Sequence, residues 1–184
     1  CEHKVGAVLS LTGAYGAHGV PISRAAQLGV EQVNEARAAL GVGCELVYDV
    51  RDSNTQASVA VDAARKLIDL EGVTALVGPI SSGITAPLLS SVTVEKDVVV
   101  VATASTSSTF TNMGKRGETK GLFFRTLSSD SLQAVAAAMM AYEAGFRKPA
   151  IIYFNNDWGK NNQAGFIDAF KALGGEIGNS VAFN

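Results

Sequence analysis

The stretch Val77-Gly78-Pro79-Ile80-Ser81-Ser82-Gly83-Ile84-Thr85-Ala86-Pro87 decides the fold of this chain. An apolar run over residues 73–77 stops at Gly78-Pro79, two serines and a glycine follow, and a helical pattern then begins. This order is typical of a parallel strand that ends in a loop and leads into a helix. Free backbone N–H groups, the positive end of the helix dipole and serine hydroxyls then converge on one point, which suits a carboxylate or phosphate. Ordinary N-capping by serine explains the same residues without a ligand, so both interpretations remain open here.

Strand and helix patterns alternate on both sides of this stretch. Continuous apolar runs, such as the four valines at 98–101, indicate strands that are buried on both faces. Between the runs, apolar residues recur at helical spacing, first after Pro21 and again after the cap residues at 52–55. This alternation predicts an α/β fold, a doubly wound parallel sheet with helices on both faces. Predicted strands cover residues 5–9, 46–50, 73–77 and 98–101, and a predicted helix covers residues 82–94.

The alternation breaks after residue 102. Residues 103–120 are a polar stretch, and residues 122–127 are a further extended segment. Beyond them the sequence predicts helices at 131–144 and 160–173 and strands at 150–154 and 177–183. Two strands are too few for a self-sufficient parallel sheet. We therefore expect a first ligand-binding lobe at residues 1–121, a crossover or hinge at 122–127 and an incomplete second α/β lobe at 128–184, completed by the rest of a longer protein or by a second chain.

The composition excludes several classes of protein. The chain has 184 residues, 47% of them hydrophobic and 17% charged, which is enough apolar material for a packed core. Fifteen basic and seventeen acidic residues give a net charge of −2 with no basic stripe, so nucleic acid is not an expected partner. Two cysteines and two histidines have neither zinc-site nor Cys-x-x-Cys spacing, and no metal or cofactor is expected.

Loops at the carboxyl ends of the predicted strands form the candidate binding site. In an open parallel sheet, ligands bind beyond these strand ends, where the strand order reverses. The loops at 12–19, 78–83 and 102–106 are rich in Gly, Ser, Thr and Tyr, so they can donate hydrogen bonds and let the backbone approach closely. Each loop alone fits a solvated turn, but three of them favour a shared pocket.

Enzyme motifs are mostly absent. Gly13-x-x-Gly16-x-x-Gly19 matches neither the dinucleotide fingerprint nor a P-loop, and no Gly-x-Ser-x-Gly elbow is present. A Ser82–His18 pair with a distant Asp is the one conceivable arrangement for acyl transfer. Because one His and many Ser residues produce such pairs by chance, the sequence predicts a binding protein and not an enzyme.

A series of motifs extends along nearly the whole chain, from about Lys4 to its end. They are Leu11-Thr12-Gly13, Tyr15, Gly19, Tyr48-Asp49-x-x-Asp52, Val77-Gly78-Pro79-x-Ser81-Ser82, Ala102-Thr103-Ala104-Ser105-Thr106, Phe124-Arg125-Thr126 and Asn156-Asp157-Trp158-Gly159. In this order they resemble type I periplasmic solute-binding proteins, and most closely the branched-chain amino acid (Leu/Ile/Val) receptors of ABC transporters. The resemblance implies two doubly wound lobes that close on a small solute, a membrane permease as partner and an extracytoplasmic location.

The resemblance also implies roles for individual residues. Ser82 matches the serine whose hydroxyl and amide hold the ligand carboxylate, and Ala104 and Thr106 match residues that bind carboxylate and ammonium. Ser81, Gly83 and Ser105 flank these positions and are included in the expected site.

Three further residues match positions that close the cleft. His18 falls where amino acid receptors often carry an aromatic lid, and Tyr15 lies nearby as a substitute. Trp158 falls where the second lobe presents an aromatic ring. A surface position for His18 and a partly buried anchor for Trp158 are the alternatives.

The ligand and the wider role stay open at this point. A branched-chain amino acid is the first expectation, but the acidic partner of its ammonium would come from later in the second lobe. The same scaffold binds amides, urea and aromatic acids. A ligand-sensing domain of a regulator or receptor is the alternative function.

Cys1 has two interpretations. It is a candidate for lipidation and membrane anchoring, or it pairs with Cys44, since both cysteines precede predicted neighbouring strands. The short tether before the first strand favours the disulfide.

Overall fold

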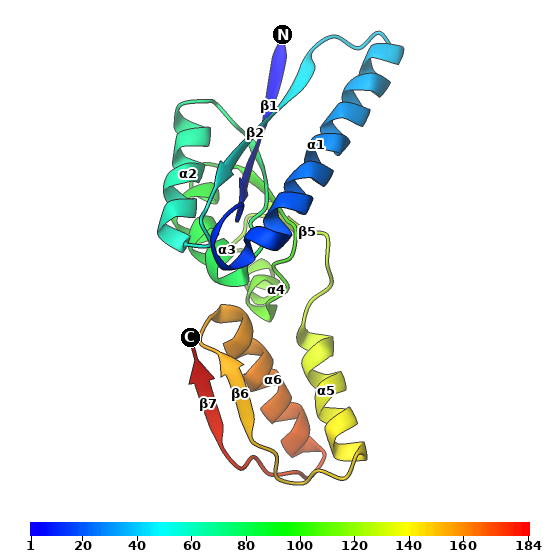
Figure 1. Cartoon of the computed structure of the whole chain (residues 1–184), viewed down its shortest axis with the longest axis vertical. Coiled ribbons are helices and arrows are strands. Elements are labelled where there is room, and N and C mark those ends of the chain that lie inside the picture. The colour runs from blue at the N-terminus through cyan, green and yellow to red at the C-terminus, as the bar shows by residue number, and fades with distance from the viewer.

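A computed structural model describes all 184 residues, Cys1–Asn184. It contains two parallel sheets, and the chain passes from the first to the second between β5 and α5 (Figure 1). The first sheet has the strand order β2-β1-β3-β4-β5, and the second consists of β6 and β7. All strand pairs are parallel. The predicted α/β architecture with an incomplete second sheet is therefore confirmed.

The elements of the first part are β1 (Glu2–Leu9), η1 (Gly13–Tyr15), α1 (Gly16–Ala39), β2 (Glu45–Asp52), α2 (Ala57–Asp69), β3 (Ala75–Val77), α3 (Ser82–Leu88), the π-helical η2 (Leu89–Thr93), β4 (Val99–Ala102), α4 (Ser108–Lys115) and β5 (Phe123–Arg125). The second part contains α5 (Ser131–Glu143), β6 (Ile151–Phe154), α6 (Asp157–Ala172) and β7 (Ser180–Phe183).

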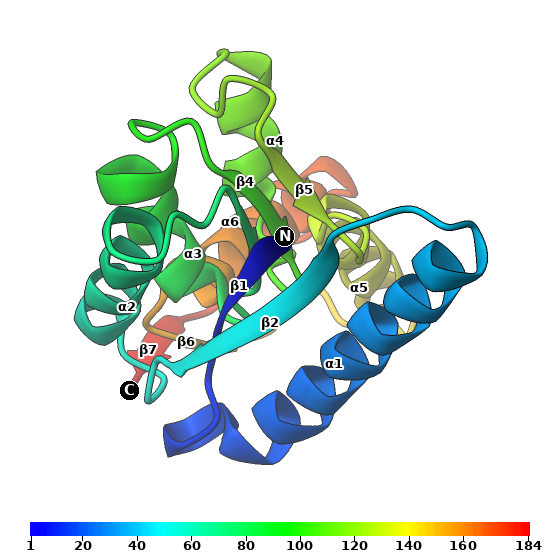
Figure 2. The ribbon, with the colours of Figure 1, turned by 90° about the horizontal axis from the view of Figure 1, so that it is seen from above.

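The main core lies between the first sheet and helices α2 and α3, while α1 lies on the opposite face (Figure 2). Ala60, Ala64 and Leu67 recur at helical spacing on α2 and are fully buried, packing with Val8 of β1. In contrast, Gly19 is the only buried residue of α1. An apolar groove of about 560 Å³ runs between α1 and the sheet. No helix combines the length and the apolar character that a membrane crossing requires.

Two local predictions near the first loop are wrong. Helix α1 begins at Gly16 and not near Pro21, because Gly19 allows the helix to lie directly against the carbonyl of Ser10. The residues at 52–55 do not cap α2: its N-cap is Gln56, without a side-chain hydrogen bond. Instead, Ser53 is buried and its hydroxyl lies 3.0 Å from that of Ser10.

The polar stretch at 103–120 contains a helix, α4, that the sequence reading missed. Ser107 caps it by accepting the N–H of Thr109 at 3.2 Å. Phe110 is buried against Phe123 with ring centroids 4.8 Å apart. Phe123 belongs to β5, which pairs with β4, so part of the predicted crossover at 122–127 forms the fifth strand of the first sheet.

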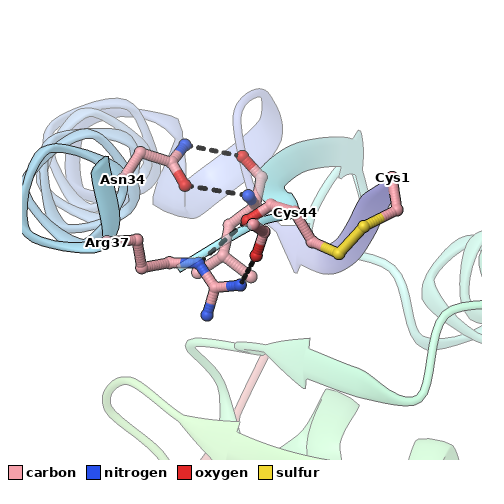
Figure 3. The surroundings of a disulfide bond; sticks show 6 residues. Cys1, Asn34, Arg37 and Cys44 are labelled. Carbon is pink, nitrogen blue, oxygen red and sulfur yellow. Dashed lines mark hydrogen bonds between the residues drawn. A yellow bond between two sulfur atoms is a disulfide. The ribbon is translucent and has the colours of Figure 1, made fainter. Parts of the chain in front are cut away.

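Cys1 and Cys44 form a disulfide at the start of β1 and β2, with Cα atoms 4.5 Å apart (Figure 3). Helix α1 stabilises the segment around Cys44 at the start of β2. Arg37 donates to the carbonyl of Cys44 at 2.9 Å, and the Asn34 side chain pairs with both backbone groups of Leu46. Since lipidation requires the same sulfur atom of Cys1, this pairing and a thioether anchor exclude each other.

Candidate ligand-binding cleft

The order of the first sheet places a switch point between β1 and β3. Strand β1 lies between β2 and β3 in the sheet. Helix α1 connects β1 to β2 on one side, and helix α3 connects β3 to β4 on the other side. Loops that leave two neighbouring strands in opposite directions open a crevice at the carboxyl ends of those strands. The loops that begin at Ser10 and Gly78 border this crevice.

A cleft of about 470 Å³ lies at this position. Seven of its lining residues come from the first sheet and its connections, and Phe154 and Trp158 come from β6 and the start of α6. Residues from both parts of the chain therefore enclose the cleft. The full lining is Tyr15, His18, Ile22, Ile80, Ser81, Ser82, Ala104, Phe154 and Trp158.

Ser82 supplies the most buried polar group of the cleft. It is the first residue of α3 and only 2% exposed. Its hydroxyl accepts the N–H of Ser107 at 3.2 Å and still has its own O–H to donate. Ser81 occupies the N-cap position, but its side chain makes no capping hydrogen bond. Simple N-capping therefore does not account for this serine pair, whose residues both line the cleft.

Ser105 is placed differently from the expectation. It is fully buried and does not line the cleft. Its hydroxyl lies 2.6 Å from the Thr85 hydroxyl and 3.3 and 3.2 Å from the carbonyl oxygens of Pro79 and Ile80. These contacts join the loop after β4 to the loop after β3. Ser105 therefore fixes the relative positions of two loops that border the cleft, without lining it.

Gly83 and Thr106 also lie outside the lining. The Thr106 hydroxyl donates to the carboxylate of Asp130, just before α5. Gly83 faces the second part of the chain: a Cβ at this position would be 3.6 Å from Cβ of Asn156. The structure thus brings together six of the nine expected residues, and it directs Gly83 and Thr106 toward the junction of the two parts.

The three residues that the resemblance assigned to closing the cleft all line it. His18 is exposed and Tyr15 is half-buried, and both line the cleft from the loop and helix after β1. Trp158 is 36% exposed and faces them from the start of α6.

Sequence reasoning missed three apolar lining residues. Phe154 ends a predicted strand, so the rule that ligands bind at carboxyl ends of strands could have identified it. Ile22 lies one turn after His18 on α1, and Ile80 lies in the loop between β3 and α3. Together with Trp158 they make the cleft mainly apolar, and Ser81 and Ser82 add hydroxyl groups to the lining.

Arg125 supports the loop that carries Ala104. Its guanidinium donates to the carbonyl of Ser107 at 3.0 Å and to the hydroxyl of Thr111 at 2.7 Å. Burial lowers the pKa of Arg125 below its ordinary value, while the charge of Asp130 acts in the opposite direction. Through these hydrogen bonds Arg125 fixes the backbone of Ser107, whose N–H donates to Ser82.

Asp52 anchors the first loop of the cleft. Its carboxylate accepts the N–H groups of Leu11, Thr12 and Asn54 at 2.9, 3.2 and 2.8 Å, as well as the Thr12 hydroxyl. Burial raises the pKa of Asp52, but the hydrogen bonds from Thr12, Asn54 and Leu11 together lower it by more. The net pKa of Asp52 therefore lies below the ordinary value. This carboxylate holds the loop that leads to Tyr15.

We expect Asp52→Asn to lower the free energy of unfolding by about 1–2 kcal/mol at pH 7, because the amide lacks the negative charge that strengthens the hydrogen bonds to Oδ1 and has no Oδ2 to accept the Thr12 hydroxyl. A pKa that is lowered by folding gives stability that is present above the unfolded pKa of about 4 and lost as the pH falls through the folded value. Urea unfolding at pH 7 and pH 3 measures the effect. The difference between wild type and variant should shrink at pH 3, and Asp49→Asn, on the same strand and paired only with Arg51, should have a smaller effect at both. An equal loss for Asp52→Asn at both pH values would contradict the assignment.

Comparison with known proteins gives the same fold. The family described as "Periplasmic binding protein" matches residues 2–184. The Leu/Ile/Val-binding protein BraC3 of Rhizobium johnstonii is 32% identical over 91% of this chain and 42% of its own length. The leucine binding protein LivK of Thermotoga maritima superposes with a TM-score of 0.79 at 26% identity, over 99% of this chain and 49% of that one.

A solute binding protein of an ABC transporter from Rhodopseudomonas palustris, solved in complex with benzoate, has the same fold with a TM-score of 0.79 at 21% identity, over 100% of this chain and 48% of that one. The chain thus spans about half the length of the relatives that it matches. The family match covers nearly every residue, and its fold is the one described above. The chain therefore belongs to the periplasmic binding protein family.

Proposed function

We propose that this chain forms the first part of an extracytoplasmic receptor of an ABC importer, which binds a small carboxylate-bearing solute between two lobes. The observation that carries the proposal is the cleft itself. It lies at the switch point of a parallel sheet, Ser82 presents a buried hydroxyl there, and Trp158 covers it from the other lobe. The matched relatives support a binding role, since their names are those of binding proteins and not of enzymes.

The serine hydroxyls of the cleft suit the carboxylate of the solute. Serine O–H and backbone N–H groups at the start of α3 are fixed before the ligand arrives, and such donors bind an anion without reorganisation. The apolar lining suits a hydrocarbon side chain or ring, and it consists mainly of Ile22, Ile80, Phe154 and Trp158. This pattern fits a branched-chain amino acid, in line with the relatives named for leucine, isoleucine and valine.

An aromatic acid is the second candidate. No Asp or Glu is among the nine lining residues, so no lining carboxylate pairs with a ligand ammonium. The neighbour solved with benzoate shows that this fold accommodates such an acid.

Lobe closure supplies the binding mechanism in this proposal. Residues 1–121 and strand β5 form the first lobe, the rest of the predicted crossover at 122–127 acts as the hinge, and residues 128–184 form the start of the second lobe. The solute docks on the serine hydroxyls of the first lobe, the second lobe swings over it, and Trp158 and Phe154 remove its apolar part from water. A membrane permease then receives it from the closed receptor. The disulfide agrees with an extracytoplasmic location, because such bonds persist in oxidising compartments.

A panel of carboxylic acids and amides that lack the carboxylate tests the proposal on the full-length protein. We expect leucine, isoleucine, valine or benzoate to raise the unfolding free energy by about 2.7 kcal/mol at about 100 times Kd, whereas leucinamide and benzamide, which lack the carboxylate, do not. Isothermal titration calorimetry then measures the affinity. Equal stabilisation by an acid and its amide would overturn the carboxylate assignment. A sensor would bind equally well but would not support uptake in vesicles that contain the permease.

A further inference from the structure

Helices α4 and α6 meet in a polar contact that lies outside the cleft. Figure 1 shows α4 next to the N-terminal end of α6, so the contact joins the first sheet's helices to the second part of the chain. Four side chains form it: Ser108 and Thr109 of α4, and Asp157 and Asn161 of α6. We call these four residues the α4–α6 junction. None of them lines the cleft.

Hydrogen bonds connect all four side chains of the junction. The Thr109 hydroxyl donates to Oδ1 of Asp157 at 3.0 Å, and Nδ2 of Asn161 donates to the same hydroxyl at 3.0 Å. The Ser108 hydroxyl donates to Oδ1 of Asn161 at 3.0 Å. Because Asn161 also donates to the backbone carbonyl of Asp157 at 2.9 Å, its side chain is fixed within α6 before it meets α4.

The junction directly adjoins the residue that covers the cleft. Trp158 follows Asp157 in the first turn of α6, so a contact that holds Asp157 also sets the position of the indole ring. Asn156 caps the same helix by accepting the N–H of Gly159 at 2.8 Å, and it faces Gly83 across the lobes. The first turn of α6 is therefore tied to the first lobe on two sides.

One atom of the junction has no partner. Oδ2 of Asp157 is buried and accepts no hydrogen bond. A buried carboxylate oxygen without a donor is unfavourable, and water reaches it only when the two helices separate. The junction thus combines contacts that hold the lobes together with one group that is better satisfied when they are apart. These opposing contributions allow the junction to bias the equilibrium between two arrangements of the lobes.

We propose that the α4–α6 junction is a latch that sets the population of the closed arrangement of the two lobes. Lobe closure belongs to the proposed function, and the latch rests on it. The latch acts through Asp157 on the position of Trp158, so its four residues are positioning residues and do not touch the solute. Breaking its hydrogen bonds favours the open arrangement and weakens solute binding although the cleft is intact.

The experiment measures the distance between the lobes in the full-length protein without ligand. Spin labels at the exposed positions 66 and 171, introduced as Lys66→Cys and Lys171→Cys, report this distance by electron–electron double resonance. Thr109→Val and Asn161→Ala each remove junction hydrogen bonds. Because each variant removes two hydrogen bonds between α4 and α6, we expect each to lower the ratio of closed to open molecules by at least about fivefold, and the double variant to lower it further. Asn112→Ala, an exposed asparagine of α4, should leave the ratio unchanged.

Distance distributions of the double variant that match those of wild type would overturn the latch. Circular dichroism and the unfolding midpoint check that each variant is folded, and Ser108→Ala provides a milder version of the same test. The readout without ligand separates this proposal from the function. If no carboxylate binds but the distances shift, the latch stands and the ligand assignment fails. If a carboxylate binds and the distances do not shift, the ligand assignment stands and the latch fails.

Discussion

Replacing Ser82 with alanine is expected to weaken binding of the carboxylate solute by about 10- to 100-fold, because a hydrogen bond to a charged group is worth about 1.5–3 kcal/mol. The residue is 2% exposed, so water cannot replace its hydroxyl in the closed cleft. The variant also loses the acceptor for the N–H of Ser107, which loosens the loop that carries Ala104. Calorimetric titration of the full-length variant with the tightest-binding acid of the panel measures the effect.

The control for this variant is Ser90→Ala. Ser90 follows α3 within the π-helical segment, is exposed, and makes only a 3.4 Å hydrogen bond to the carbonyl of Pro87. Its replacement should leave the affinity unchanged. Equal affinities of Ser82→Ala and wild type would mean that the carboxylate does not bind at the start of α3.

The second large effect is expected for Gly19→Ala, which should lower the free energy of unfolding by about 3 kcal/mol, the upper end of the range for overpacked sites. A Cβ at this position would lie 1.8 Å from the carbonyl oxygen and 2.5 Å from the carbonyl carbon of Ser10. Both atoms are backbone at the end of β1, so no side chain can move aside. Relief requires α1 to shift away from the sheet, and this shift would also displace Tyr15 and His18.

Gly29→Ala provides a matched control on the same helix. A Cβ at Gly29 meets no atom within 4 Å, so this change should raise stability by about 0.5–1 kcal/mol through helix propensity alone. Urea unfolding of the two variants compares them. Similar stabilities for Gly19→Ala and Gly29→Ala would show that α1 does not lie against β1 as described.

The sequence predicted the buried strands of the first sheet because their burial requires continuous apolar runs. The valine run of β4 is the clearest example. It did not predict α4, whose Ser and Thr residues are weak helix formers. That helix depends on Phe110 packing against Phe123 of β5, a contact that a local pattern cannot reveal. Asp52 was similarly misassigned as a cap residue, because its partners Leu11 and Thr12 come from another strand's loop.

The location of the candidate cleft could be predicted because strand ends and the switch point follow from topology alone. The direction of individual side chains could not. Ser105 and Thr106 are adjacent in one loop, yet one hydroxyl is buried against Thr85 and the other donates to Asp130. Which hydroxyl faces a ligand depends on how two loops pack, and this information is not local to either of them.

A crystal structure of the full-length protein with the tightest-binding acid of the panel tests the central claim most directly. We predict electron density for the solute between the lobes, with its carboxylate about 3 Å from Oγ of Ser82 and its apolar part against Trp158. Density in the groove between α1 and the sheet, or a carboxylate that points away from Ser82, would contradict the proposed receptor site.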